Sequence, residues 1–186
     1  MAIGYRRDAA MPAREHEGGA VGQLLLHGAI GGLLVGIIFA LFEMAVAAVK
    51  MGALDAAWMP LRMIGATVLG EDALMPGYSL AKAATTGLLV HMLLSAAFGV
   101  AFAALLVGVP ALRRSTLWLV GAATAYGLLL WPVNFYVIAR LAGWDWFPDG
   151  ADQFWQGFVA HTFVFGTLLG VYLATMLRRP AAAGAH

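Results

Sequence analysis

The sequence contains no cysteine and very little charge. Only 11% of its 186 residues are charged, whereas an ordinary soluble domain has about 25%, so a typical water-soluble fold is excluded. Without cysteine the chain cannot form a disulfide, a cysteine-ligated iron–sulfur cluster or a thiolate zinc site, although histidine and carboxylate ligands are still available. The net charge of +1 argues against a nucleic-acid surface.

Long uncharged segments take the place of the missing charge, in a chain that is 62% hydrophobic. Each is close to or longer than the roughly 20 residues that a helix needs to cross the hydrocarbon core. They run from Gln23 to Phe42, from Ala83 to Leu112, from Ser115 to Ala139 and from Gln153 to Leu177. The sequence therefore predicts an all-α membrane protein, a four-helix up-down bundle in one domain of residues 21–179. The expected transmembrane helices cover about 21–50, 80–109, 115–140 and 152–178.

The arginine and lysine residues indicate how this bundle is oriented, because positively charged flanks are retained on the cytoplasmic side. The side of the two termini carries Arg6, Arg7, Arg14, Arg113, Arg114, Arg178 and Arg179, and the other side carries Lys50, Arg62, Lys82 and Arg140. We therefore expect both termini in the cytoplasm and the protein in the bilayer of a bacterial cytoplasmic (inner) membrane. Residues 1–20 are expected to form a disordered cytoplasmic tail, and residues 180–186 a short C-terminal tail.

The first outer loop, from about Met51 to Ser79, is too long to be a simple turn. Within it, Pro60 suits the first turn of a helix and Gly70 suits its end. Apolar residues recur between them at helical spacing, namely Leu61, Ile64, Val68 and Leu69. The sequence predicts a short interfacial helix over about 59–70, lying on or dipping into the outer surface.

Small residues recur every fourth position along two of the predicted helices. Gly28, Gly32 and Gly36 form such a ridge in the first helix, and Gly166 and Gly170 continue the pattern in the fourth. Ridges of this kind let membrane helices approach closely. They predict tight packing, either inside the bundle or against another copy of the chain or a larger membrane complex.

Three ionisable side chains, Glu43, His91 and His161, lie in or at the edge of the apolar segments. A charged group costs roughly 3 kcal/mol or more at the middle of a bilayer, so such residues mark functional sites by default. Counting about 1.5 Å per residue from the outer helix ends places all three at depths similar to that of Asn134. The sequence therefore predicts one Glu-His-His-Asn cluster in the outer leaflet.

Three interpretations of this cluster stay open. The first is a hydrogen-bonded network in an accessory or structural subunit, or in a proton-handling component. The second is a b-type haem electron carrier that uses His91 and His161 as iron ligands. The third is a metal-dependent membrane enzyme with Glu43, His91 and His161 around a divalent metal such as zinc or iron. The sequence shows no phosphate-binding glycine loop, nucleophile elbow or paired carboxylates, which favours the first interpretation over an autonomous enzyme.

Parts of the second half of the chain resemble a known family. The segment from His91 to Val100, the segment from Ala160 to Phe165 and the Arg178-Arg179 pair resemble the YagU-like bacterial inner-membrane proteins. In that family an early helix is followed by a long outer loop and three more helices, with histidines in the second and fourth. The resemblance implies an inner-membrane location and a part in acid tolerance, and it implies nothing for Glu43.

Overall fold

The structure is a computed structural model that describes residues 13–147 and 151–178, without the side chains of residues 13–17 and 151–153. Within these ranges the chain is helical throughout, with turns between the helices and no strand. Four helical stretches are long and apolar enough to cross a membrane: Gly18–Met51, Leu80–Gly108, Thr116–Leu141 and Phe154–Leu177. The prediction of an all-α protein with four potential membrane spans is thus confirmed.

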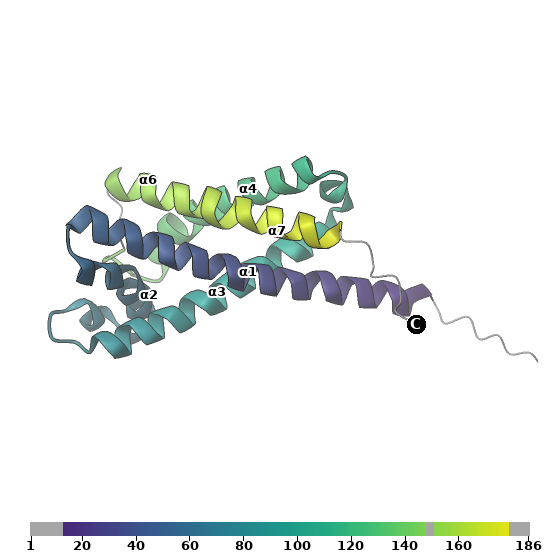
Figure 1. Ribbon diagram of the computed structural model, residues 1–186. Coiled ribbons are helices and arrows are strands. Elements are labelled where there is room, and N and C mark those ends of the chain that lie inside the picture. Colours follow the sequence, from purple (N-terminus) through teal and green to yellow (C-terminus); the bar gives the residue numbers. More distant parts are fainter. Residues whose placement is uncertain (1–12, 148–150, 179–186) are drawn as a thin grey trace, which may run out of the picture.

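The helices form a bundle with two distinct ends (Figure 1). Helix α1 (Ala13–Met51) begins at the end where α7 (Leu168–Leu177) stops, which we name the terminal end. The short helix α2 (Met59–Leu69) lies at the opposite end, which we name the α2 end. Helices α3 (Leu80–Gly108) and α4 (Thr116–Pro132) complete the described long elements, together with α6 (Ala151–Val159) before α7.

Helix α1 starts earlier than the sequence analysis expected, since Ala13–Ala20 is helical and not part of a tail that extends to residue 20. These residues include alanine, arginine and glutamate, which have high helix propensity, and the long apolar helix that follows lets the helix propagate backwards. Residues 1–12 and 179–186, which hold the rest of the two expected tails, lie outside the described residues.

Helices α1 and α3 pack with their backbones in contact. A Cβ atom placed on Gly32 would overlap the carbonyl oxygen of Ser95, and one placed on Gly28 would lie 2.6 Å from the carbonyl oxygen of Gly99. Residue numbers rise along α1 as they fall along α3 in these pairs, so the two helices run antiparallel. The glycine ridge of the first helix therefore packs inside the chain and is not free to bind a second copy.

A second close contact joins α4 to the last helical stretch. Gly166 lies against the backbone of Ala123 and Gly127, and Gly170 lies against Val120 and Ala123. Between the two helix pairs, the largest fully buried side chains are Phe102, Leu106, Leu169 and Leu173. Phe102 and Leu106 lie near the end of α3, and Leu169 and Leu173 lie in α7, so the most deeply buried part of the apolar core is in the half of the bundle towards the terminal end.

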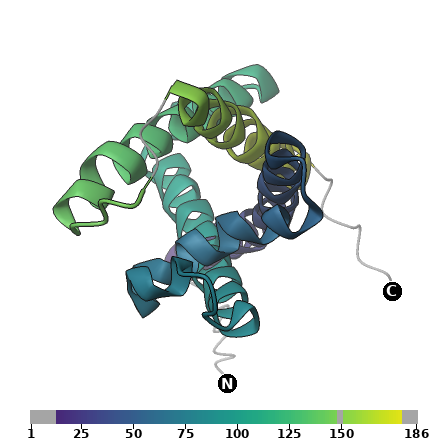
Figure 2. The same cartoon turned by 90° about the vertical axis from the view of Figure 1, so that its left-hand side faces the viewer.

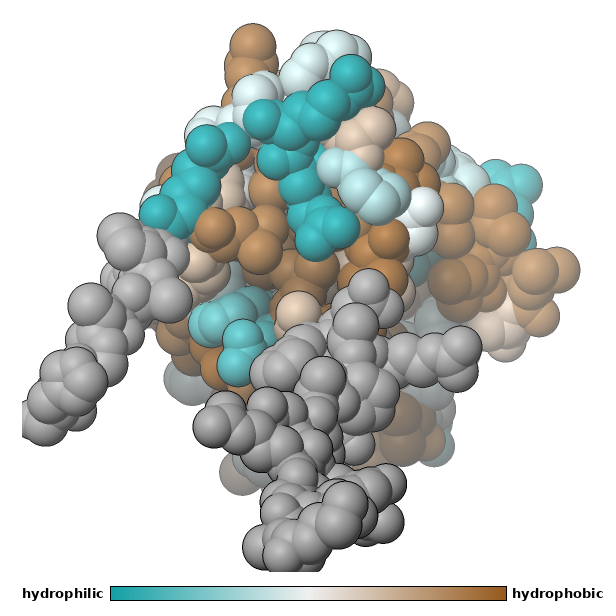
Figure 3. All heavy atoms as spheres, turned by 90° about the vertical axis from the view of Figure 1, so that its right-hand side faces the viewer, coloured by the Kyte–Doolittle hydropathy of each residue, from teal (hydrophilic) through white to brown (hydrophobic). Residues whose placement is uncertain are grey.

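The outer faces of the long helices are covered with exposed aliphatic side chains, as a lipid-facing surface requires. Leu41 on α1 is 60% exposed, Leu93 on α3 is 71% exposed and Leu129 on α4 is 62% exposed. Hydrophilic residues gather instead at the terminal end, which faces the viewer in Figure 3, with hydrophobic residues around them. This distribution is the reverse of that in a water-soluble helical bundle.

The α2 end is built from α2 and two short 3-10 turns, Leu54–Trp58 and Glu71–Leu74 (Figure 2). Gly65 of α2 approaches the backbone of Ala83, and Gly87 approaches that of Leu61, so α2 packs closely on the start of α3. Arg62 holds the following turn through hydrogen bonds to the carbonyl oxygens of Ala73 (2.8 Å) and Met75 (2.9 Å). A helix is present where the sequence predicted one, and its place at a membrane surface stays a prediction.

Candidate functional site

Two π-helical turns interrupt the last two long helices near the middle of the bundle. The first, Val133–Ile138, follows Pro132, which has no N–H to offer Leu128 and whose ring does not fit the regular α-helical ladder. The second, Ala160–Thr167, joins α6 to α7. Asn134 lies in the first of these turns and His161 in the second. Such wide turns are rare and occur frequently at functional sites.

His91 projects from α3 into the contact with α1, where it is buried. Its Nε2 atom lies 2.8 Å from the carbonyl oxygen of Gly36. A carbonyl oxygen can only accept, so Nε2 carries the hydrogen and donates it, and in the neutral ring Nδ1 is the proton acceptor. The glycine ridge makes this bond possible, because a side chain on Gly36 would lie against Ser95 and close to the imidazole.

His161 also bonds a backbone carbonyl oxygen, but through Nδ1 where His91 uses Nε2. Its Nδ1 atom lies 2.9 Å from the carbonyl oxygen of Gly157, one turn earlier in the same helix. Nδ1 is therefore the donor, and Nε2 is the proton acceptor of the neutral ring. Gly157 in turn has no room for a side chain, since the indole of Trp131 packs against its α-carbon. The two histidines thus have opposite tautomers.

Phe39 of α1 contacts both imidazole rings. Its ring centroid is 5.5 Å from that of His91 and 4.9 Å from that of His161, which it meets edge to face at 85°. Phe135, from the first π-helical turn, contacts the same His161 ring at 5.6 Å. The imidazoles therefore share an aromatic environment without a hydrogen bond between them. Phe39 was missed in the sequence, although it lies on the face of α1 that holds Gly36 and Glu43.

Glu43 lies one turn beyond Phe39 on the same face of α1, about 6 Å further towards the α2 end at 1.5 Å per residue. Gln156 of α6 donates a hydrogen bond of 2.5 Å from its Nε2 atom to Oε2 of Glu43. The positive charge of the Lys50 ammonium group also interacts electrostatically with this carboxyl group. Gln156 also lines a groove of about 360 Å³, together with Phe42, Val46, Lys50, Trp155 and Val159.

Gln156 is the second site residue that the sequence analysis missed. A signal was available, because an amide side chain in an apolar segment needs a partner as much as a carboxyl group does. Gln156 lies in the same apolar segment as His161, one turn and a residue before it, and its side chain hydrogen-bonds Glu43.

The structure differs from the single Glu-His-His-Asn cluster predicted from the sequence. The polar residues form two groups: His91 and His161, which both contact Phe39, and Glu43 with Gln156. Asn134 is half-buried, and its side chain has no hydrogen bond to any residue in the described part of the chain. The reason is that each group has a different partner: the histidines bond backbone carbonyl oxygens and Glu43 bonds Gln156.

The residues do not fit the metal or haem interpretations in this arrangement. Within residues 13–147 and 151–178, no three histidine, aspartate or glutamate side chains lie close enough together to hold a metal ion. For a haem, Nε2 of His91 is engaged with Gly36, and the Phe39 ring packs against both imidazoles. A haem ligated through Nε2 of both rings would need to break the bond between His91 and Gly36.

Comparison of the chain with family models, curated proteins and solved structures found no match. The class of the protein therefore follows from the chain itself: a polytopic membrane protein with four potential membrane spans.

Proposed function

We propose that the protein is a proton-handling accessory component of a bacterial cytoplasmic membrane, and not an autonomous enzyme. The observation that carries this proposal is that His91 and His161 each bond a backbone carbonyl oxygen, through Nε2 in His91 and through Nδ1 in His161. Each ring is held by one N–H bond to a backbone carbonyl oxygen, and each has a second nitrogen with no hydrogen bond in the described part of the chain. Each histidine can therefore take up a proton without giving up the bond that orients it.

The proposed threading places the four helices up and down across the membrane with both termini in the cytoplasm. The excess of arginine on the side of the termini supports this orientation. In it the α2 end faces outwards, and α2 lies at the outer surface, where Trp58 (41% exposed) and Val68 (66% exposed) meet the headgroup region.

In this orientation the two polar groups form successive layers from the outer surface inwards. Glu43 and Gln156 lie nearer the α2 end, where Gln156 lines a groove. His91 bonds Gly36, which lies seven residues before Glu43 on α1 and therefore about 10 Å deeper. We propose that a proton from the outer side reaches the Glu43 carboxyl group first. The acceptor nitrogens of His161 and His91 then take up the proton and pass it on towards the terminal end. The resemblance to YagU-like proteins, with its implied part in acid tolerance, agrees with this role.

Proton movement across proteoliposomes tests the proposed function. With a pH-sensitive dye inside the vesicles and a potassium gradient with valinomycin to drive protons inwards, the wild-type protein is expected to acidify the lumen. Glu43→Gln and His161→Gln are each expected to slow this about tenfold or more, because each removes a group that takes up the proton.

His27→Gln provides the matched control. His27 lies on the same helix, but its Nδ1 atom faces the Tyr172 hydroxyl group at 3.4 Å, away from both layers. This variant is expected to conduct as the wild type does. A wild-type rate no higher than that of protein-free vesicles, or equal rates in all variants, would overturn the proposed function.

A further inference from the structure

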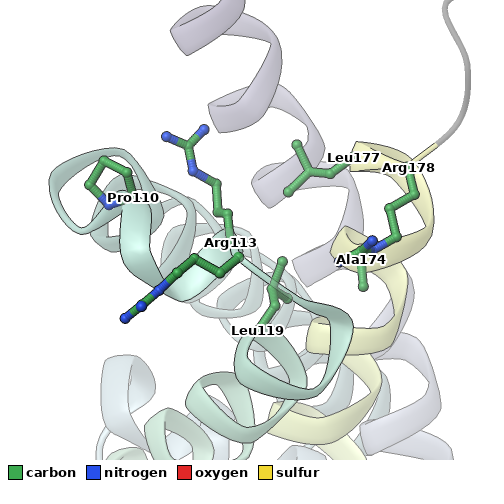
Figure 4. A pocket seen from close by; sticks show the side chains of 7 residues that line it. Pro110, Arg113, Leu119, Ala174, Leu177 and Arg178 are labelled. Carbon is green, nitrogen blue, oxygen red and sulfur yellow. The ribbon is translucent and has the colours of Figure 1, made fainter.

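A second groove, unrelated to the polar layers, lies at the terminal end of the bundle (Figure 4). It has a volume of about 420 Å³ and lies between the α3–α4 turn and the end of α7. Arg113 enters from the turn, and Arg178 comes from the end of α7 on the other side. Its lining includes three arginines and no acidic residue. The residues that line it include Pro110, Arg113, Arg114, Leu119, Leu177 and Arg178.

The three guanidinium groups are not neutralised by the part of the chain that the structure describes. Arg114 donates from Nε to the carbonyl oxygen of Ala111 at 3.1 Å, which fixes its direction and leaves its terminal N–H groups available. Arg113 and Arg178 make neither a hydrogen bond nor an ion pair within the described residues. Three like charges around one groove repel one another, and an anion bound between them offsets this repulsion.

The rest of the groove is apolar, and this decides which kind of anion suits it. Leu119 and Ala174 form a buried floor, and Leu177, which is 41% exposed, forms one wall. The groove also lies where the spans end, since α3 stops at Gly108 and α4 begins at Thr116. A site with cationic side chains above an apolar floor, at the level of the headgroups, suits an amphiphile and not a small hydrophilic ion.

We propose that this groove binds the phosphate group of an anionic phospholipid, with the acyl chains running along the outer faces of α4 and α7. Arginine suits this role, because its planar guanidinium group binds phosphate oxygens in pairs. The start of α4 adds the positive end of a helix of 17 residues, capped by the Ser115 side chain. Exposed Leu117 and Trp118, which are 82% and 62% exposed, provide an adjacent surface for the chains.

Lipid retention by the purified full chain tests this proposal. The protein is released from nanodiscs of equal phosphatidylglycerol and phosphatidylcholine, and bound lipids are counted by native mass spectrometry. The wild type is expected to retain phosphatidylglycerol selectively. Arg113→Gln/Arg178→Gln is expected to weaken its binding about 30-fold, because each basic residue at an anionic headgroup contributes about fivefold.

The double variant Lys82→Gln/Arg140→Gln removes the same charge at the α2 end and serves as the matched control, with retention expected to equal that of the wild type. Equal losses in both double variants, or no selectivity in the wild type, would overturn the proposal. Displacement of the lipid by millimolar inorganic phosphate would also overturn it, because the groove would then be a site for free phosphate. If the arginine variant does not fold, the wild type is measured at increasing salt concentration instead. Its selectivity for phosphatidylglycerol must then fall, because salt screens the attraction between arginine and the anionic lipid. Unchanged selectivity contradicts the proposal.

Discussion

Replacement of Gly32 by leucine is expected to destabilise the folded bundle by about 3 kcal/mol. Even a single added carbon at this position would overlap the carbonyl oxygen of Ser95, and that oxygen belongs to the backbone of α3. Backbone cannot rotate out of the way as a flexible side chain can, so the two helices must separate. Separation also removes the contact of Gly36 with the His91 ring, so the histidine layer should be lost together with stability.

Gly121→Leu is the control for this substitution. Gly121 lies within α4, with no atom of the chain within 4 Å of an added Cβ, and it faces the surface that meets lipid. Unfolding of both variants in mixed micelles, titrated with a denaturing detergent and followed by tryptophan fluorescence, measures the difference. Equal stabilities for the Gly32 and Gly121 variants would mean that α1 and α3 are not in backbone contact.

The second large effect is expected when Gln156 is replaced by leucine. The Glu43 carboxyl group then loses its amide donor within the apolar part of the bundle, at an expected cost of about 1–3 kcal/mol. The hydrogen bond itself is a small part of this, because bonds between membrane helices average about 0.6 kcal/mol. Most of the loss comes from the buried carboxyl group, which loses its hydrogen-bond donor and keeps only the charge interaction with Lys50.

The double variant Glu43→Leu/Gln156→Leu separates these two contributions. With both side chains replaced, neither leaves its partner as an unsatisfied polar group between α1 and α6, and stability is expected to return to within about 1 kcal/mol of the wild type. The same unfolding titration is applied to the wild type, to each single leucine variant and to the double variant. Together these four values give the coupling free energy between Glu43 and Gln156. If the double variant is as unstable as the sum of the single ones, Glu43 and Gln156 do not bond each other.

Much of this fold could be predicted from composition, because crossing a bilayer needs a long apolar helix and few other structures satisfy the backbone there. The glycine ridge was equally readable, since Gly28, Gly32 and Gly36 occur at a spacing that puts them on one face of the helix. The partner of that ridge was not readable. The spacing of Ser95 and Gly99 does not show whether α1 packs against their helix or against another chain.

The candidate site shows where sequence reasoning ends. Helical phase and depth placed Glu43, His91 and His161 on inward faces at similar levels, but they could not show that the three side chains bond to different partners. The π-helical turn around His161 rotates every later residue of that helix relative to regular α-helical spacing. Gln156 became a partner of Glu43 only through the approach of α1 and α6, which is a property of tertiary packing.

Nitrogen-15 NMR of the histidine side chains in lipid bilayers shows directly which ring nitrogens carry a hydrogen. The signals of the two histidines are assigned with the variants His91→Gln and His161→Gln. At neutral pH we expect His91 to carry its hydrogen on Nε2 and His161 to carry its hydrogen on Nδ1. On acidification we expect both rings to reach the doubly protonated form while the protein stays folded. Identical tautomers at neutral pH, or spectra that do not change until the protein unfolds, would contradict a role in proton handling.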